Sequence, residues 1–297
     1  MEVREKLDPV ALQQAVTAMS QAIATIEPRI LRLSLLIIGS LIFLAPYIFI
    51  ISTAGKAQDD IFTSALKLIP THFYYVENIA KALSKVSMGT LLFNGVLVCG
   101  LIFFFQVLIA IPCAYAMAKL KFPAARMMMV LVMLGLLVPI HATALPLYVG
   151  FNSLSLLNSY TALVAPFSIS VFAIFMFLQF FRSMPDDLIH AARLDGMSEI
   201  GIVARVIVPN AWPAVTAFAI FSVVAHWNDL YWPLIVISKQ DYFTPPLGLM
   251  YFRAAEAGDD YGALMAATLI ITLPLVAAFL LAQKRFVEGI TMTGLKG

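Results

Sequence analysis

The chain has 297 residues, of which 61% are hydrophobic and 12% are charged, and its formal net charge is +2. A soluble domain would carry about a quarter charged residues. The composition therefore excludes an ordinary soluble globule and predicts a polytopic membrane protein. We expect no nucleic-acid partner, and the net charge of +2 gives no indication of one. The positions of the charges matter instead, because they set the orientation in the bilayer.

The N-terminal segment, residues 1–30, is polar or amphipathic and lacks a cleavable signal pattern. Its apolar residues recur at spacings of three and four, which predicts one amphipathic helix lying on the membrane surface or on a neighbouring subunit. Pro28 is expected to end this helix. The apolar stripe consists of Leu12, Val16, Met19, Ile23 and Ile26.

Six stretches are apolar enough to cross a bilayer, since a spanning helix needs about 20 such residues. The sequence therefore predicts an all-α fold with a six-helix transmembrane domain over residues 31–283 and a C-terminal tail over residues 284–297. An even number of spans puts both termini on one side. The predicted spans are Leu33–Ile51, Ser87–Ala118, Met127–Tyr148, Thr161–Phe181, Val215–Ile237 and Gly262–Gln283.

The positions of Lys and Arg predict the orientation. Thirteen of the 19 basic residues fall in the two termini and in the loops after the second and fourth spans, and six fall on the opposite face. Cytoplasmic loops carry the excess of Lys and Arg. We therefore expect both termini and the loop over residues 182–213 to be cytoplasmic.

The chemistry of an enzyme is missing from the sequence. It contains no phosphate-binding loop of the Gly-x-x-x-x-Gly-Lys-Ser/Thr type, no Cys/His cluster with metal-ligand spacing and no catalytic constellation. Cys99 and Cys113 lie in apolar runs and are expected to be buried thiols. We expect no catalytic residue, metal or cofactor in this chain, so energised work would draw on another polypeptide.

The loop over residues 182–213 is the longest polar interruption in the second half of the chain. Ser183 is expected to cap a helix whose first turn holds Asp186 and Asp187, where the helix dipole favours negative charge. Gly196 provides a turn that a side chain would obstruct. Ser198 is expected to cap a second helix that Pro209 ends. The local pattern is equally typical of an ordinary cytoplasmic helical hairpin.

Several spaced motifs carry a resemblance to a known family. Residues 191–196, Ala-Ala-Arg-Leu-Asp-Gly, followed by Ile-Val-Pro at 207–209, resemble the EAA motif of ABC-importer permeases. The likeness covers most of the chain and is closest to the maltose-transporter second-permease family of carbohydrate importers. The other matching segments are residues 115–123, 146–148, 157–160, 180–185, 227–234 and 286–289.

The resemblance implies a permease subunit of an ATP-driven, binding-protein-dependent importer in a bacterial inner membrane, with a carbohydrate as solute. It implies a homologous second permease, two copies of an ABC ATPase that holds ATP and Mg²⁺, and an extracytoplasmic solute-binding protein. The alternatives are an importer of a glycerol phosphate or polyol and, further off, an ion-coupled secondary transporter. The implied ATPase-coupling residues are Asp187, His190, Ala191, Ala192, Asp195, Gly196 and Pro209.

His190 departs from the family pattern, which has Glu before the two alanines. A neutral imidazole lacks the attraction that the carboxylate has for a basic group on the ATPase, and a charged imidazole reverses its sign. Asp187 lies one turn earlier on the same helix face and is placed to substitute in part.

Polar residues inside the predicted spans are candidates for the translocation pathway, because ionisable groups in a membrane usually face a partner or water. Asn228 and Asp229 alternatively bond backbone groups freed by a helix break near Pro233. Trp227 and Trp232 either stack on sugar rings or pack inside the bundle, and His141 and Asn94 alternatively bond neighbouring helices. The candidate pathway residues are Asn94, His141, His226, Trp227, Asn228 and Asp229.

Overall fold

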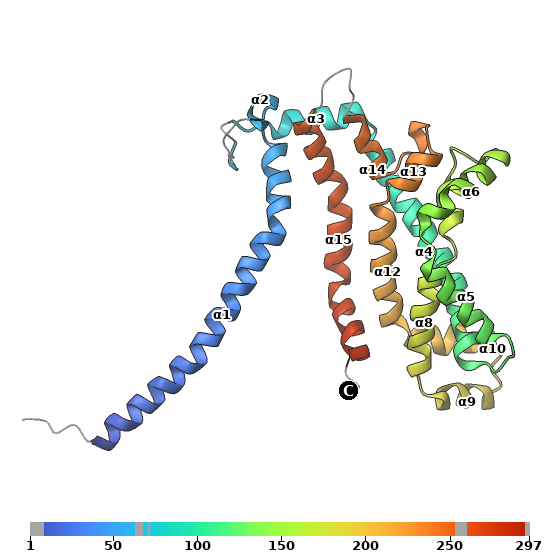
Figure 1. Cartoon of the computed structure of the whole chain (residues 1–297), viewed down its shortest axis with the longest axis horizontal. Coiled ribbons are helices and arrows are strands. Elements are labelled where there is room, and N and C mark those ends of the chain that lie inside the picture. Colours follow the sequence, from blue (N-terminus) through green and yellow to red (C-terminus); the bar gives the residue numbers. More distant parts are fainter. Residues whose placement is uncertain (1–8, 63–67, 71, 253–259, 295–297) are drawn as a thin grey trace, which may run out of the picture.

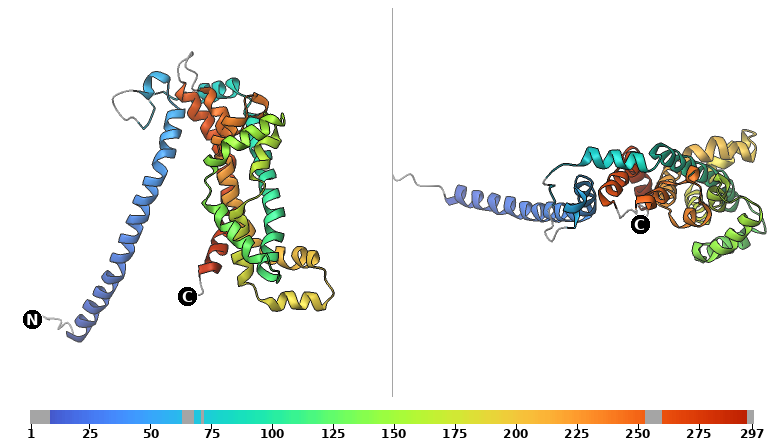
Figure 2. Two further views of the ribbon diagram at one scale, coloured as in Figure 1. Left: turned by 45° about the vertical axis from the view of Figure 1, so that its right-hand side comes forward. Right: turned by 90° about the horizontal axis from the view of Figure 1, so that it is seen from above.

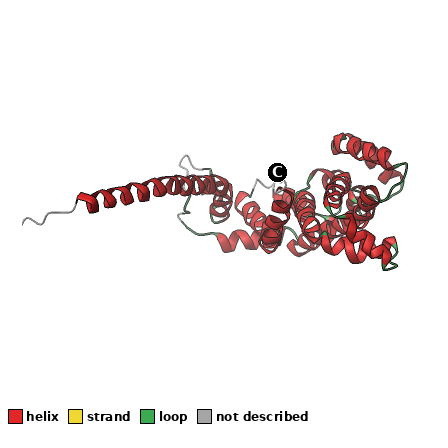
Figure 3. Ribbon diagram, turned by 90° about the horizontal axis from the view of Figure 1, so that it is seen from below, coloured by secondary structure: helices red, strands yellow, loops and turns green. Residues whose placement is uncertain are grey.

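The structure is a computed structural model that describes residues 9–62, 68–70, 72–252 and 260–294. The ends of the predicted terminal segments, residues 1–8 and 295–297, lie outside this range. In the described residues the fold is all-α, without strands (Figure 3). The helices are α1 (Pro9–Ala54), α2 (Gln58–Ile61), α3 (Tyr75–Lys85), α4 (Met88–Lys119), α5 (Ala125–Leu137), α6 (Ile140–Ser153), α7 (Tyr160–Val164), α8 (Val171–Ser183), α9 (Asp186–Leu194), α10 (Glu199–Ile202), α11 (Val208–Asn210), α12 (Trp212–Trp227), α13 (Tyr231–Val236), α14 (Pro245–Leu249) and α15 (Tyr261–Gly294).

The long helices run between two ends of the molecule (Figure 1). α9 and α10 lie at one end, which we call the inner end, and the first residues of α1 and the last residues of α15 lie toward the same end (Figure 2). α3, α6, α13 and α14 lie at the opposite, outer end (Figure 1). The placement of these two helix ends at the same end as the 182–213 loop agrees with the topology predicted from six spans.

Among the residues that the structure describes, three helices are long and apolar enough to cross a membrane by themselves, and up to six spans result if each of three bent helix pairs counts as one. The unbent spans are Arg29–Ala54, Met88–Lys119 and Tyr261–Gln283. α5 and α6 meet at 96°, the segments Tyr160–Phe167 and Val171–Ser183 at 41°, and the segments Glu199–Asn210 and Trp212–Trp227 at 77°.

Prolines shape these helices in two ways. Pro139 forces the preceding Val138 into an extended conformation (ψ 114°), and the predicted third span is therefore broken between α5 and α6. Pro28, by contrast, does not end the N-terminal helix as predicted, because α1 runs unbroken from Pro9 to Ala54. The proline removes only one backbone hydrogen bond, a loss that a long helix tolerates.

The predicted fifth span is wrong in its boundaries. α12 begins at Trp212 and ends at Trp227, and α13 is a separate short helix. Asn228 is the C-cap of α12, and both its backbone amide and its side-chain Nδ2 donate to the Val224 carbonyl, at 3.3 and 2.8 Å. The polar residues near position 228 therefore lie at a helix end rather than in the middle of a helix.

The buried core has two parts. One, at the outer end, surrounds Trp232 and Phe252, and the other, at the inner end, surrounds Phe177, Phe181 and Phe218. α4 contributes to both and packs against α8 and α12. α1 contacts α15 and α3, but its membrane-spanning window buries no residue inside this chain.

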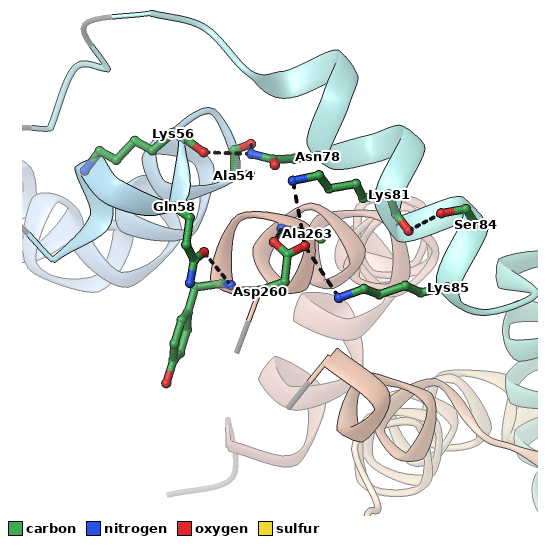
Figure 4. Close-up of polar contacts among 10 residues, drawn as sticks. Ala54, Lys56, Gln58, Asn78, Lys81, Ser84, Lys85, Asp260 and Ala263 are labelled. Carbon is green, nitrogen blue, oxygen red and sulfur yellow. Dashed lines mark hydrogen bonds and ion pairs between the residues drawn. The ribbon is translucent and has the colours of Figure 1, made fainter. Parts of the chain in front are cut away.

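Polar contacts hold the outer end together (Figure 4). Asn78 on α3 donates through Nδ2 to the backbone carbonyls of Ala54 and Lys56, at 2.9 Å each. Asp260 caps α15 by accepting from the Ala263 amide, and Lys81 and Lys85 approach its carboxylate at 3.9 and 3.5 Å. α3 is thereby fixed across the ends of α1 and α15.

Candidate functional site: the inner knob and the intramembrane polar residues

α9 presents one exposed stripe at the inner end. Asp187, His190, Ala191 and Leu194 follow the spacing of one helix face, and all four are exposed, Leu194 by 89%. Ile189 and Ala192 lie on the opposite face and are 2% and 4% exposed. Ala192, predicted to be part of the coupling surface, is instead packed against the inner core.

The turn after α9 is built as the sequence predicts. Gly196 has a φ of +76°, a conformation that favours glycine, and the space around it is open. Ser198 caps α10, because its Oγ accepts from the Gly201 amide at 3.2 Å. Asp195 ends α9 and is exposed. We call the whole segment Asp186–Asn210 the knob.

Two details of the knob differ from the predictions. Ser183 does not cap α9 but belongs to the last turn of α8, where its Oγ donates to the Phe180 carbonyl. Pro209 does not end the second helix. The chain passes through a π-helical segment, Val203–Ile207, and continues to Asn210. The missing amide of Pro209 is compatible with this widened turn, and the bend follows at Ala211.

Lys119 fastens the start of the knob to α4. Its Nζ donates to Asp186 Oδ1 at 2.6 Å and to the Met184 carbonyl at 2.7 Å. The hydrogen bond and positive charge of Lys119 hold the pKa of the Asp186 carboxyl below its usual value. The lysine side chain is only 5% exposed, so the contact is partly shielded from solvent.

A second polar contact joins the two arms of the knob. Arg193 Nε donates to Glu199 Oε1 at 2.9 Å, and the Tyr115 hydroxyl on α4 donates to Glu199 Oε2 at 2.5 Å. Ile202 and Ile207, both 0% exposed, pack into the inner core. The knob is therefore a rigid continuation of α4, α8 and α12 rather than a loose loop.

A buried polar cluster lies on α4 midway between the two cores. Gln106 Nε2 donates to the Phe167 carbonyl at 2.9 Å, and its Oε1 accepts from Ser222 Oγ at 2.7 Å. A carbonyl only accepts, which fixes the orientation of the Gln106 amide. His226 Nε2, 3.3 Å from the same amide nitrogen, must then be an acceptor, so the imidazole is neutral with its proton on Nδ1.

Two predicted pathway residues are structural in this conformation. Asn94 is 0% exposed, and all its polar groups are bonded: Nδ2 donates to the carbonyls of Asp241 and Phe243, and Oδ1 accepts from Tyr160. Trp227 is 6% exposed, and its Nε1 donates to the Ile271 carbonyl at 3.1 Å. Both side chains are buried, and each forms hydrogen bonds that join different segments of the chain.

The remaining pathway candidates are accessible to different degrees. His141 and Asn228 are exposed, whereas His226 and Asp229 are half-buried. Asp229 Oδ1 accepts from the Trp232 amide at 3.3 Å and so fixes the first turn of α13. Trp232, proposed as an alternative sugar-stacking residue, is 1% exposed, and its Nε1 donates to the Ala162 carbonyl at 2.8 Å.

Sequence reasoning gave no role to the polar residues that organise these sites. Asn158 Oδ1 accepts from the backbone amides of Ser238 and Lys239 at 2.6 and 2.8 Å, and Tyr160 bonds Asn94. Both lie in a segment that sequence analysis had matched only as part of a family motif. Tyr115 and Lys119 likewise lie in a matched segment, residues 115–123, without a predicted contact, because their partners are 65 to 84 residues away. Glu199 had no signal of its own.

The fold and the knob define a multi-pass, all-α membrane protein with a rigid exposed helix pair at its inner end. Residues 106–291 match the family of the binding-protein-dependent transport system inner membrane component. This match covers more than half of the chain, and the protein belongs to that family.

Individual relatives are permeases of several importers. The chain is 36% identical over 183 residues to the arabinooligosaccharides transport system permease protein AraQ of Bacillus subtilis, a match covering 62% of this chain and 65% of AraQ. The chain thus spans just under two thirds of that relative. It is 28% identical to the diacetylchitobiose uptake system permease protein NgcG of Streptomyces coelicolor, over 92% of this chain and 91% of NgcG.

The chain is also similar to a third permease and to a chain of a solved transporter structure. The sn-glycerol-3-phosphate transport system permease protein UgpE of Yersinia enterocolitica is 28% identical over 86% of this chain and 93% of its own length. A chain of a bacterial ABC transporter involved in the import of the acidic polysaccharide alginate superposes with a TM-score of 0.74 at 20% identity, covering 86% of this chain and 95% of that chain. At this identity the likeness supports the fold alone.

Proposed function

We propose that the chain is a permease subunit of an ATP-driven, binding-protein-dependent importer of a carbohydrate, located in a bacterial inner membrane. It forms half of the translocation pathway and docks an ATPase through the knob. The observation that carries the proposal is the exposed stripe of α9, Asp187, His190, Ala191 and Leu194, on a helix whose other face is packed into the core. An exposed helix face on a rigidly packed helix can bind the ATPase and transmit its movement to the transmembrane helices.

The partners follow from this role. A homologous second permease completes the pathway, two copies of an ABC ATPase hold ATP and Mg²⁺ at the cytoplasmic side, and a solute-binding protein delivers the solute. This chain would contribute no cofactor. The membrane-spanning window of α1 is apolar and buries no residue within the chain, which supports the presence of a neighbouring membrane subunit.

The mechanism is alternating access. Closure of the ATPase pair on ATP displaces the knob, and Lys119 and Glu199 contacts carry that displacement to α4. α4 belongs to both the inner and the outer core, so a movement at the inner end is transmitted toward the outer end.

Two other solutes and one other mechanism are alternatives. UgpE is named for sn-glycerol-3-phosphate, which favours a glycerol phosphate as the second candidate solute, with a polyol after it. Ion-coupled secondary transport would need a site that binds the coupling ion. Asp229 is the nearest candidate, and its carboxylate is engaged in capping α13.

The test is uptake by the reconstituted complex. The chain is co-expressed with the second permease, ATPase and binding protein that are proposed to assemble with it, purified, and placed in proteoliposomes. We expect uptake of a neutral oligosaccharide that requires ATP and the binding protein and survives collapse of the proton gradient. Uptake that a proton gradient drives without ATP would refute the proposal.

A further inference from the structure

An exposed pair of rings lies at the outer end of the bundle. The ring centroids of His141 and Tyr231 are 4.5 Å apart. His141 is the second residue of α6, which the 96° bend after α5 turns away from the bundle axis (Figure 1). Tyr231 is the first residue of α13 and is 39% exposed. Two helices that start at different helix breaks thus bring these rings together.

The outward direction of Tyr231 is set by its neighbours. Asp229 accepts from the Trp232 amide and fixes the first turn of α13, while the Trp232 side chain is buried and bonded to the Ala162 carbonyl. With Trp232 turned inward, the adjacent Tyr231 faces outward. Asp229 is therefore a positioning residue for this pair.

The polar groups of this patch are free to bind. Among the residues that the structure describes, neither ring nitrogen of His141, nor the Tyr231 hydroxyl, nor Asn228 Oδ1 has a hydrogen-bond partner. Exposed polar side chains of this kind are costly against lipid hydrocarbon. The patch therefore faces water or a polar solute.

The charge of the patch selects the solute. Residues 140–153 and 212–236 contain no Lys or Arg, so α6, α12 and α13 offer no cation to a phosphate or carboxylate. Aromatic surface combined with a few neutral hydrogen-bond groups is the composition of a site for an uncharged small molecule. A sugar ring presents apolar C–H faces and a rim of hydroxyls that fit such a surface.

We propose that Tyr231, His141 and Asn228 form a contact site for a neutral, hydroxyl-rich solute at the outer end of the translocation pathway. The inference rests on the proposed transport function and adds to it a place on this subunit and a solute charge. It excludes an anion such as a glycerol phosphate as the solute that this subunit recognises.

Protection of single cysteines tests the site in the assembled transporter. Cys99 and Cys113 are replaced by Ala, Tyr231→Cys is introduced, and labelling by a membrane-impermeant maleimide is followed in spheroplasts. The probes are an arabinooligosaccharide and diacetylchitobiose against sn-glycerol 3-phosphate, each at millimolar concentration. The matched control is Leu234→Cys, on the same helix and 53% exposed.

We expect the neutral oligosaccharides to slow labelling at Tyr231→Cys by about twofold or more, because a solute at a concentration equal to a millimolar Kd occupies half of the sites. We expect no slowing at Leu234→Cys. Slowing by glycerol phosphate as strong as by the oligosaccharides, equal slowing at the control, or no slowing at all overturns the proposal. If Tyr231→Cys fails to assemble, Asn228→Cys is read in its place with the same outcomes. ATP-dependent uptake by the parent complex is measured in parallel. If labelling is not slowed but uptake is normal, only the proposed contact site is refuted. If uptake itself is absent, the proposed transport function is refuted.

Discussion

Lys119 Nζ, at the last residue of α4, lies 2.6 Å from Asp186 Oδ1, at the first residue of α9. The two residues are 67 positions apart in the chain, and their contact joins the helix that passes through both cores to the helix that carries the exposed stripe. We therefore expect the contact between Lys119 and Asp186 to transmit a displacement of the knob to α4.

Replacement of Lys119 by Met should weaken this transmission. The side chain keeps its apolar stem but loses its bonds to Asp186 and to the Met184 carbonyl. We expect transport per ATP hydrolysed to fall about threefold or more, while the subunit still inserts, because the knob loses its charged contact with α4. Lys121→Met, at an exposed position nearby, is the control. Equal coupling ratios in both variants would refute the role of Lys119.

The same pair predicts an acid sensitivity. The pKa of Asp186 is lowered in the folded protein by Lys119. Its contribution to stability is therefore present above the unfolded carboxyl pKa and is lost as pH falls through the folded value. The protection factors of the α9 amides, which are corrected for the intrinsic pH dependence of exchange, should fall in wild type as the medium is acidified below the ordinary Asp range. Asp186→Asn should exchange faster at neutral pH and show less of this pH dependence; an identical pH profile in both proteins would contradict the prediction.

Gly196 should tolerate only residues that accept a positive φ. The φ of +76° costs an ordinary L residue about 1 to 2 kcal/mol, although no atom blocks the added Cβ. We expect Gly196→Leu to uncouple ATP hydrolysis from transport while the subunit remains in the membrane, and Gly196→Asn to be milder. Gly150→Ala, at a helical glycine with open space, is the control. Normal transport by Gly196→Leu would show that the conformation of the turn at Gly196 is not needed for coupling.

How far the sequence predicted the molecule depended on whether a feature was local. Helix content, the sidedness of the termini and the turn at Gly196 arise from apolar run length, loop position and one backbone conformation, and all were predicted. The interruption of the fifth span by the polar residues at 226–229 was predicted, but the separate helix α13 that follows it was not. The break after Leu137 was missed, although Pro139 carries a local signal for it. Ala192 and Asn94 were misplaced for another reason: burial on one helix face, or bonding to a loop 147 residues away, has no trace in the local pattern.

Asn94 should matter for stability rather than for solute recognition. Replacing it by Ala leaves the carbonyls of Asp241 and Phe243 and the Tyr160 hydroxyl without their partner. Each unsatisfied buried group costs about 1 to 3 kcal/mol, so the purified complex should unfold at a clearly lower temperature. Asn228→Ala, the same change at an exposed position, should leave the melting temperature nearly unchanged. Equal melting temperatures for the two variants would show that the hydrogen bonds of Asn94 do not stabilise the fold.

His190 is the position at which this chain departs from the pattern of the family it resembles, and its exposure on the α9 stripe makes the consequence measurable. Replacement by Glu restores the carboxylate. The local cost is small, because Lys119 already neutralises Asp186 and only Asp187 remains as a nearby like charge on the stripe. We therefore expect His190→Glu to preserve or strengthen binding of the ATPase, measured as the fraction that copurifies at increasing salt. His72→Glu, the same change on the outer side, is the control. Loss of the ATPase from the His190→Glu complex alone would mean that the imidazole meets an acidic or hydrogen-bond acceptor group of its own on the partner, and that the carboxylate of the family pattern is repelled there.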